Sequence, residues 1–167
     1  MCIRDRARAH HGGGTTAVQV ARHLPRDLRA VVVTHSPSIA VELAEHPTVE
    51  VIMIGGRLFK HSIVGVGAAT MEAIGQVRAD IFFMGVCSVH PQAGVTTGDY
   101  EEGCVKRAIS AAALRTVVLA SPEKLDTAAP FHTVPLAQVS DIIVNAGVDE
   151  ALLAPYRSMG IAITLAT

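Results

Sequence analysis

The alternation of short apolar runs with segments of helical periodicity is the feature that most constrains the fold of this chain. Most of the runs are continuously hydrophobic and rich in β-branched residues, which is typical of strands that helices cover on both faces. These runs lie at 30–34, 49–54, 80–86, 116–120, 141–145 and 161–165. Segments with helical spacing or helix-end signals separate several of them, at 16–24, 38–46, 101–114 and 149–159. Because strands that alternate with helices favour parallel pairing, we predict one doubly wound α/β domain with a mostly parallel sheet.

The composition supports a well-packed core and excludes several classes of protein. Half of the 167 residues are hydrophobic and 17% are charged, so a disordered or charge-driven chain is excluded. Lys and Arg number 14 against 15 acidic residues, a net charge of −1, which leaves no polybasic surface for nucleic acid or anionic lipid. The longest apolar runs are too short to cross a bilayer. We expect a soluble, cytoplasmic protein that by itself binds neither DNA nor a membrane.

Cysteine and histidine show neither a disulfide pattern nor a metal-binding pattern. The cysteines are far apart and include no CxxC pair, which fits a reducing compartment; they are Cys2, Cys87 and Cys104. Cys87 follows an apolar strand, so we expect a buried small hydrophobe rather than a nucleophile. The eight histidines form no HxH or HExxH pattern, and His61, His90 and His132 fall in predicted loops. We expect neither a metal nor a cofactor.

The first eleven residues differ from the rest of the chain. Residues 1–11 are charged, lack apolar periodicity and run directly into three glycines. From Thr15 onward, strand-like and helix-like segments alternate regularly. We expect residues 1–11 to be a non-native or truncated leader and residues 12–167 to form the domain.

Ligands of doubly wound sheets bind beyond the carboxyl ends of the strands, so the loops at those ends are candidates for the site. The segment 12–16, Gly-Gly-Gly-Thr-Thr, precedes a helix and offers close backbone approach, free N–H groups and hydroxyls, which suit a phosphate or carboxylate. A glycine turn with a threonine N-cap is the alternative. Segments 34–36 (Thr-His-Ser) and 55–56 (Gly-Gly) follow the next strands. They could contact a ligand, but capping by Ser36 and a tight turn also explain them.

The segment from Gly94 to Glu102 is the richest of these predicted loops in polar groups. Its glycines, hydroxyls, carboxylates and phenol lead into a helix. Glu102 and Lys106 are spaced i,i+4, so they share a helical face, either as a surface ion pair or with Lys106 on an anion and Glu102 on a hydroxyl. Lys124 follows strand 116–120 at the same predicted end of the sheet, where a loop lysine is normally solvated.

In this order, these loops resemble the C-terminal effector-sensing domain of DeoR-type bacterial repressors of sugar metabolism. The resemblance covers nearly everything from Gly12 to Ala166, and it is specific because of the order of the motifs rather than the strength of any one. The matching stretches are GGGTT (12–16), VVVTHS (31–36), VIMIGGRL (51–58), SIVG (62–65), ADIFFMGVCSV (79–89), GVTT (94–97), EEGCVKRAI (101–109), VVLASPEKL (117–125) and DIIVNAG (141–147).

The resemblance implies a Rossmann-like fold of the type shared by sugar-phosphate isomerases and CoA transferases. It also implies a domain that binds a phosphorylated sugar or related metabolite and forms homo-oligomers. In the family a helix-turn-helix domain precedes this one and binds the operator. We therefore expect contact with DNA only through a missing N-terminal domain.

The resemblance further implies a set of ligand-binding residues. Those expected to hold phosphate are Gly14, Thr15 and Thr16. Those expected to line the pocket are Thr34, His35, Gly55, Gly56, Gly85, Gly94 and Thr96. Those expected to make polar and charged contacts are Glu102, Lys106 and Lys124.

The chain departs from the family pattern at several of these places, and the departures bear on which effector is bound. Gly12 and Gly13 stand where the family has an acidic residue and a serine. His35 replaces an asparagine, and segment 121–124 replaces Asp-Ser-Ser-Lys. Asn145 replaces an aspartate.

We expect the sensor domain of a transcriptional repressor, in which the effector favours a state with weaker operator affinity. A sugar-phosphate isomerase or deaminase is the alternative, with Asp99, Glu101 or Glu102 as general base. Such a base needs a hydrogen-bonding relay, which the sequence does not show. A purely structural oligomerisation module would leave the glycine and hydroxyl loops without a purpose. We therefore expect no enzymatic activity.

Overall fold

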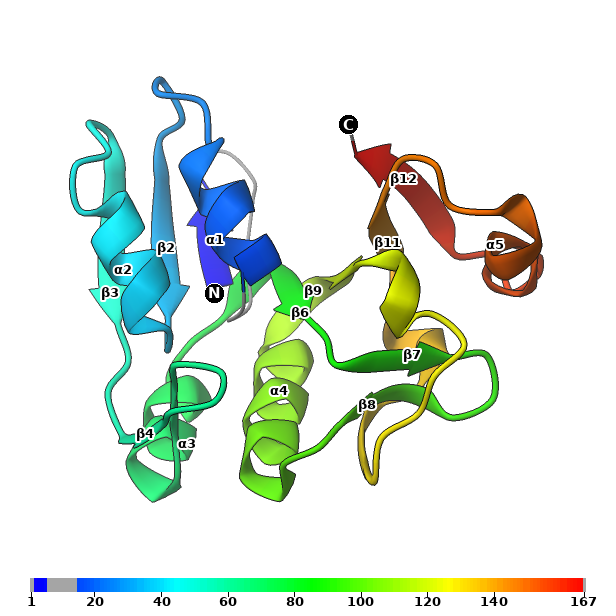
Figure 1. Cartoon of the computed structure of the whole chain (residues 1–167). Helices are drawn as coiled ribbons and strands as arrows, with labels where there is room; N and C mark the ends of the chain where they lie inside the picture. The colour runs from blue at the N-terminus through cyan, green and yellow to red at the C-terminus, as the bar shows by residue number, and fades with distance from the viewer. Residues whose placement is uncertain (1, 6–14, 167) are drawn as a thin grey trace.

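The computed structural model of the chain describes residues 2–5 and 15–166, with side chains from residue 16 onward (Figure 1). Within these residues the central sheet has the strand order β12-β11-β9-β6-β1-β2-β3. Neighbouring strands are parallel, except that β1 is antiparallel to both β2 and β6. The strands are β1 (Cys2–Asp5), β2 (Ala30–Thr34), β3 (Val49–Met53), β6 (Ala79–Gly85), β9 (Ala113–Ala120), β11 (Asp141–Asn145) and β12 (Ala162–Ala166). The predicted doubly wound, mostly parallel α/β fold is confirmed.

Helices pack on both faces of this sheet, so its strands carry apolar side chains on both sides. Successive residues of a strand point to opposite faces: Val32 packs in one buried cluster with α1 and α2, and Val33 in another with α3, α4 and α5. Leu119 and Val118 of β9 divide between the two clusters in the same way. The helices are α1 (Thr15–Arg22), α2 (Pro37–Leu43), α3 (Ala68–Gly75), α4 (Tyr100–Ala112) and α5 (Glu150–Ser158).

Two small sheets accompany the central one and help to shape the site (Figure 1). Strands β4 (Arg57–Phe59) and β5 (Val64–Val66) form an antiparallel hairpin after β3. Strands β7 (Ser88–His90), β8 (Gly94–Thr97) and β10 (Phe131–Val134) form an antiparallel sheet. Two short 3-10 turns complete this region, η1 (Pro122–Lys124) and η2 (Leu136–Gln138).

The prediction that segment 94–102 is a loop was wrong for its first part, because Gly94–Thr97 forms the middle strand β8. Val95, Thr96 and Thr97 are β-branched, and such side chains suit a strand. The hydroxyls of Thr96 and Thr97 suggested a loop because sequence alone does not show that two further strands pair with this segment. For the same reason His90 and His132 lie in β7 and β10 rather than in loops.

Helix boundaries also differ from those expected. The predicted helix 101–114 ends at Ala112, and β9 begins at Ala113, several residues before the apolar run that marked it. Helix α3 was not predicted because only Thr70 and Ile74 in it are buried, which leaves little apolar periodicity to detect.

The expected side-chain cap at Ser36 is absent. Ser36 stands at the N-cap of α2, but its hydroxyl donates to the carbonyl oxygen of Ile63, at 3.3 Å, instead of accepting from the helix. This contact ties the start of α2 to the β4–β5 loop. True side-chain caps occur at Asp99 on α4 and at Asp149 on α5.

The proposed boundary between a leader and the domain stays a prediction. Of residues 1–11 only Cys2–Asp5 is described, as strand β1. The glycines at 12–14 lie outside the described residues. Among the helices that are described, none is long and apolar enough to cross a membrane.

The core generates a first prediction about stability. Phe82 is fully buried in β6 at the middle of the sheet, and we expect Phe82→Ala to lower the free energy of unfolding by about 3–5 kcal/mol because it leaves a cavity. Phe131→Ala, on the more exposed ring that contacts Tyr100, is the matched control and should cost much less. Urea denaturation measures both, and equal losses would contradict the assignment of the core.

Candidate functional site

An open cleft of about 550 Å³ lies beyond the carboxyl ends of β6 and β9. This volume falls in the range of small-molecule sites. The residues that line it come from α1, α2, the β4–β5 loop, the end of β6, α4 and η1. Of the ligand-binding residues predicted from the sequence, the cleft brings together Thr16, Gly85, Glu102, Lys106 and Lys124.

Of the other predicted residues, those whose side chains the structure describes do not line this cleft. Thr34 is buried at the end of β2, and Gly55 and Gly56 form the turn after β3, where the Thr70 hydroxyl donates to the Gly55 carbonyl oxygen. Gly94 lies at the β7–β8 turn with a positive φ of 73°. The Thr96 hydroxyl accepts from the Ala129 N–H at 2.8 Å. Gly14 is outside the described residues, and Thr15 is the first residue of α1.

Several lining residues were not predicted as ligand contacts. His61, Ser62 and Ile63 form the tip of the β4–β5 hairpin and face the cleft. The motif SIVG at 62–65 was a signal for this segment. Ile63 adopts a positive φ of 51°, which is strained for a β-branched residue and which the sequence does not reveal.

The expectation that Cys87 is a buried hydrophobe was wrong. Strand β6 ends at Gly85, so Cys87 has already left the sheet, and its side chain is exposed in the cleft. Its sulfur lies 3.5 Å from the hydroxyl oxygen of Thr97.

A buried ion pair forms the floor of the cleft. Glu102 and Lys106 are each only 3% exposed, and the Lys106 ammonium lies 3.1 Å from the Glu102 carboxylate. The Thr97 hydroxyl donates to the second carboxylate oxygen at 2.7 Å. The Asp99 carboxylate caps the helix by accepting from the Glu102 N–H at 2.8 Å. The i,i+4 pair expected from the sequence is therefore buried rather than on the surface.

The surroundings of Glu102 keep its carboxylate charged. Burial raises the pKa of Glu102, but the charge of Lys106 and hydrogen bonds from Thr97, Lys106 and Ser62 outweigh it, so the pKa lies below its ordinary value. A charged carboxylate accepts hydrogen bonds only, whereas an ammonium group carries three donors. The pair can therefore accept from one ligand hydroxyl and donate to another ligand oxygen.

Lys124 provides a second cation in the lining of the cleft. It is the last residue of η1, just after β9, and its side chain is partly buried. Among the described residues its ammonium makes no hydrogen bond or ion pair, in contrast to Lys106. A cation without a partner at the edge of a cleft is available to an anionic ligand.

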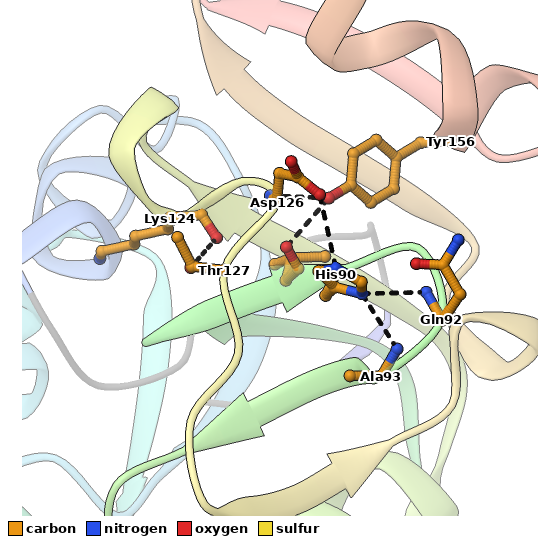
Figure 2. Close-up of polar contacts among 8 residues, drawn as sticks. His90, Gln92, Ala93, Lys124, Asp126, Thr127 and Tyr156 are labelled. Carbon is orange, nitrogen blue, oxygen red and sulfur yellow. Dashed lines mark hydrogen bonds and ion pairs between the residues drawn. The ribbon is translucent and has the colours of Figure 1, made fainter.

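The loop that carries Lys124 is held by contacts with β7 and α5 (Figure 2). The Thr127 hydroxyl donates to the Lys124 carbonyl oxygen at 2.8 Å. The Tyr156 hydroxyl, from α5, accepts from the Asp126 N–H at 3.1 Å and donates to the Val89 carbonyl oxygen at 2.9 Å. Burial raises the pKa of Tyr156, so the hydroxyl stays protonated.

His35 is buried beside the site rather than in it. It is 2% exposed, and neither ring nitrogen has a hydrogen-bond partner among the described residues. The ring lines a small void between the sheet and helices α3 and α4, with apolar neighbours such as Ile54, Ile74 and Ile109. Burial lowers the pKa of His35 well below 6.5, and the charge of Lys106 acts in the same direction, so the ring is neutral.

The described residues contain no group of three or more His, Cys, Asp or Glu side chains placed to hold a metal ion. The polar groups of the cleft include hydroxyls, the Gln19 amide, the His61 ring, the buried ion pair and the Lys124 ammonium, and apolar side chains such as Val18 and Val86 line it as well. Groups of this kind can contact a small polar anion through hydrogen bonds and charge.

The fold and cleft together define a class of α/β domains that bind a small molecule at the carboxyl edge of a mostly parallel sheet. Comparison with known families is more specific. The family model of the DeoR C-terminal sensor domain matches residues 2–146, and the chain belongs to this family.

Curated relatives are transcriptional regulators. The HTH-type transcriptional regulator GlpR of Haloferax volcanii is 27% identical over 90% of this chain and 58% of its own length. The putative aga operon transcriptional repressor of Escherichia coli O157:H7 is 25% identical over 91% of this chain and 56% of its own. The glycerol-3-phosphate regulon repressor of Haemophilus influenzae is 30% identical over 77% and 49%. The chain thus spans about half the length of these relatives.

The buried ion pair generates a prediction about stability. Glu102→Gln leaves the Lys106 charge buried without its counter-charge, and we expect it to lower the free energy of unfolding by about 3–5 kcal/mol at neutral pH. The double variant Glu102→Gln/Lys106→Met removes both charges and should recover part of that loss. Urea denaturation of the parent, Glu102→Gln, Lys106→Met and the double variant gives the four free energies of the double-mutant cycle. A double variant no more stable than Glu102→Gln would contradict the pairing.

His35 generates a prediction about pH. Its folded pKa is depressed below 6.5, so the unfolded chain takes up the proton first as the pH falls. The contribution of neutral His35 to the free energy of unfolding is then fully present above pH 6.5. It declines below that pH by at most about 1.4 kcal/mol per pH unit. The decline starts at higher pH than that of Glu102, whose contribution is lost only below about 4.5.

His35→Asn should flatten the stability profile between pH 6.5 and 4.5, because asparagine does not titrate. His23→Asn, at an exposed residue directly after the end of α1, is the matched control. Chemical denaturation at several pH values measures the slope, and an unchanged slope in His35→Asn would refute the role assigned to burial.

Proposed function

We propose that this cleft binds a phosphorylated sugar or a related phosphorylated metabolite, and that the domain is the effector sensor of a transcriptional repressor. The observation that carries the proposal is the accessible Lys124 facing the same cleft as the buried Glu102–Lys106 pair. Lys124 suits a phosphate, and the Glu102–Lys106 pair suits hydroxyls.

The phosphate end of the ligand is assigned to Lys124 and the start of α1. Thr16 lies in the first turn of α1 and lines the cleft. The N-terminus of a helix offers free N–H groups and a partial positive charge, which favour an anion. Gly14 and Thr15, expected from the family resemblance to hold phosphate, directly precede Thr16 in the chain.

The hydroxyl end of the ligand is assigned to Glu102, Lys106 and the β4–β5 loop. The charged carboxylate accepts from a ligand hydroxyl, and Lys106 donates to a neighbouring oxygen. Ser62 lines the same cleft as Glu102 and Lys106, so this loop is placed to respond when a ligand enters.

The regulatory role rests on the family and on the relatives, which are named as transcriptional regulators and repressors. We propose that the whole protein is a cytoplasmic homo-oligomer rather than an enzyme, and that it binds its operator through a helix-turn-helix domain outside this chain. Effector binding then changes operator affinity only to the extent that the ligand binds two states of the protein differently.

Calorimetry tests the ligand class. We expect binding to at least one of glucose 6-phosphate, N-acetylglucosamine 6-phosphate and glycerol 3-phosphate, and much weaker binding to the unphosphorylated compounds. Lys124→Ala removes one charge-assisted contact of about 1.5–3 kcal/mol, so the phosphorylated ligand should bind about 10–100-fold more weakly.

Arg29→Ala is the control for loss of a positive charge, because Arg29 is exposed just before β2, at the opposite end of the sheet. It should bind like the parent. Equal affinity of the parent and Lys124→Ala for every phosphorylated compound would remove Lys124 from the site. Failure of all three to bind the parent would count against a phosphorylated effector.

A further inference from the structure

We propose that Tyr156 is a positioning residue for Lys124, so that helix α5 sets the affinity of the cleft for the anionic part of its ligand. This inference rests on the proposed function for its ligand, but the contact between Tyr156 and the Lys124 loop stands on the geometry alone. The family model matches residues 2–146, so Tyr156 lies outside the matched region.

Tyr156 connects three parts of the chain that are far apart in sequence (Figure 2). Its side chain is fully buried and belongs to the main core cluster. Its hydroxyl makes two hydrogen bonds, one to the Val89 carbonyl oxygen of β7 and one from the Asp126 N–H of the Lys124 loop. The donor and the acceptor capacity of the hydroxyl are both in use.

Val89 is the anchor to which the loop is attached. Its carbonyl oxygen also accepts from the Thr127 N–H, at 3.3 Å, and Val89 forms an isolated parallel bridge with Leu125. Val89 is itself fully buried. Tyr156 therefore supports the loop both directly, through Asp126, and through the carbonyl group on which Thr127 also depends.

The loop depends on this support because its regular structure is short. Asp126 has a positive φ of 55°, a left-handed conformation that is uncommon in non-glycine residues and that contacts with the surroundings help to hold. The 3-10 turn η1 has only the three residues Pro122–Lys124. The carbonyl oxygen of Lys124 accepts from Thr127, the residue after Asp126, so the position of Lys124 follows that of Asp126.

His90 provides a second, weaker contact with the same loop. Its Nδ1 accepts from the N–H groups of Gln92 and Ala93, at 3.2 and 3.3 Å, which assigns the proton of the neutral ring to Nε2. Nε2 lies 3.5 Å from an Asp126 carboxylate oxygen that is largely exposed. Since an exposed contact at that distance is weak, the buried Tyr156 hydroxyl is the stronger constraint on Asp126.

The test uses Tyr156→Phe, which keeps the ring in the core and removes only the hydroxyl. Tyr100→Phe is the matched control, because Tyr100 is exposed and contacts Phe131 through its ring. Leu153→Val is the control for general destabilisation, because Leu153 is a buried core residue of the same helix α5. The readouts are amide hydrogen exchange of each variant and titration with inorganic phosphate and glucose 6-phosphate.

In Tyr156→Phe we expect amide exchange at Asp126 and Thr127 to accelerate at least about tenfold, since local opening exposes these groups. We also expect both phosphate probes to bind about 3–10-fold more weakly, the loss of up to about 1.4 kcal/mol. Leu153→Val should lower thermal stability without these two changes, and Tyr100→Phe should behave like the parent.

Unchanged exchange at Asp126 and Thr127 would overturn the proposal, and so would faster exchange with unchanged affinity for probes that the parent binds. Equal weakening in Leu153→Val would reduce Tyr156 to a general core residue and would also overturn it. If the parent bound neither probe, the link between Tyr156 and ligand affinity would fail, and the proposed function would fail with it only if N-acetylglucosamine 6-phosphate and glycerol 3-phosphate did not bind either. The exchange data would then still decide whether Tyr156 holds the loop.

Discussion

The buried pair of Glu102 and Lys106 is the constraint on which the arrangement of the site depends. Two charges removed from water are tolerated only when they are paired and their remaining hydrogen-bonding groups are satisfied. Thr97 from β8 donates a hydrogen bond to Glu102, Lys106 pairs with Glu102 from the next turn of α4, and Ser62 from the β4–β5 loop lines the cleft beside the pair. Helix α4, the small sheet that contains β8 and the β4–β5 hairpin therefore meet around this ion pair, and the cleft lies next to it.

Much of the central architecture could be predicted from the sequence because its strands carry a strong local signal. The runs 30–34 and 141–145 coincide with β2 and β11, since strands covered on both faces carry apolar residues at successive central positions. The small strands carry no such signal. Residues 94–97 contain a glycine and two threonines. They form a strand because they pair with β7 and β10. Strand β7 is short and partly polar, and β10 is distant in sequence, so neither predicts this pairing.

The sequence predicts which charged residues form the candidate site, but it does not predict which side chains are buried and which are exposed in the cleft. Spacing alone placed Glu102 and Lys106 on one helical face, and the order of the loops placed Lys124 at the same edge of the sheet. Whether a side chain beside a strand end faces the cleft or the core depends on where the strand stops. Thus Cys87 is exposed and His35 is enclosed between the sheet and helices α3 and α4. The support that Tyr156 gives to the Lys124 loop bridges a sequence separation that no local pattern reports.

The direct passage from α4 into β9 has a consequence for the size of molecule that the cleft accommodates. Ala112 ends the helix and Ala113 begins the strand, and a buried hydrogen bond of 2.7 Å between the Ser110 and Thr116 hydroxyls closes the junction. Lys106 lies in α4 before this junction, and Lys124 lies just after β9. The backbone between the two lysines therefore has no flexible linker between helix and strand. Any molecule that contacts both must match a separation imposed by the scaffold. For a ligand that contacts both ammonium groups, the fold then adds selection by length to the recognition of individual oxygens by side chains.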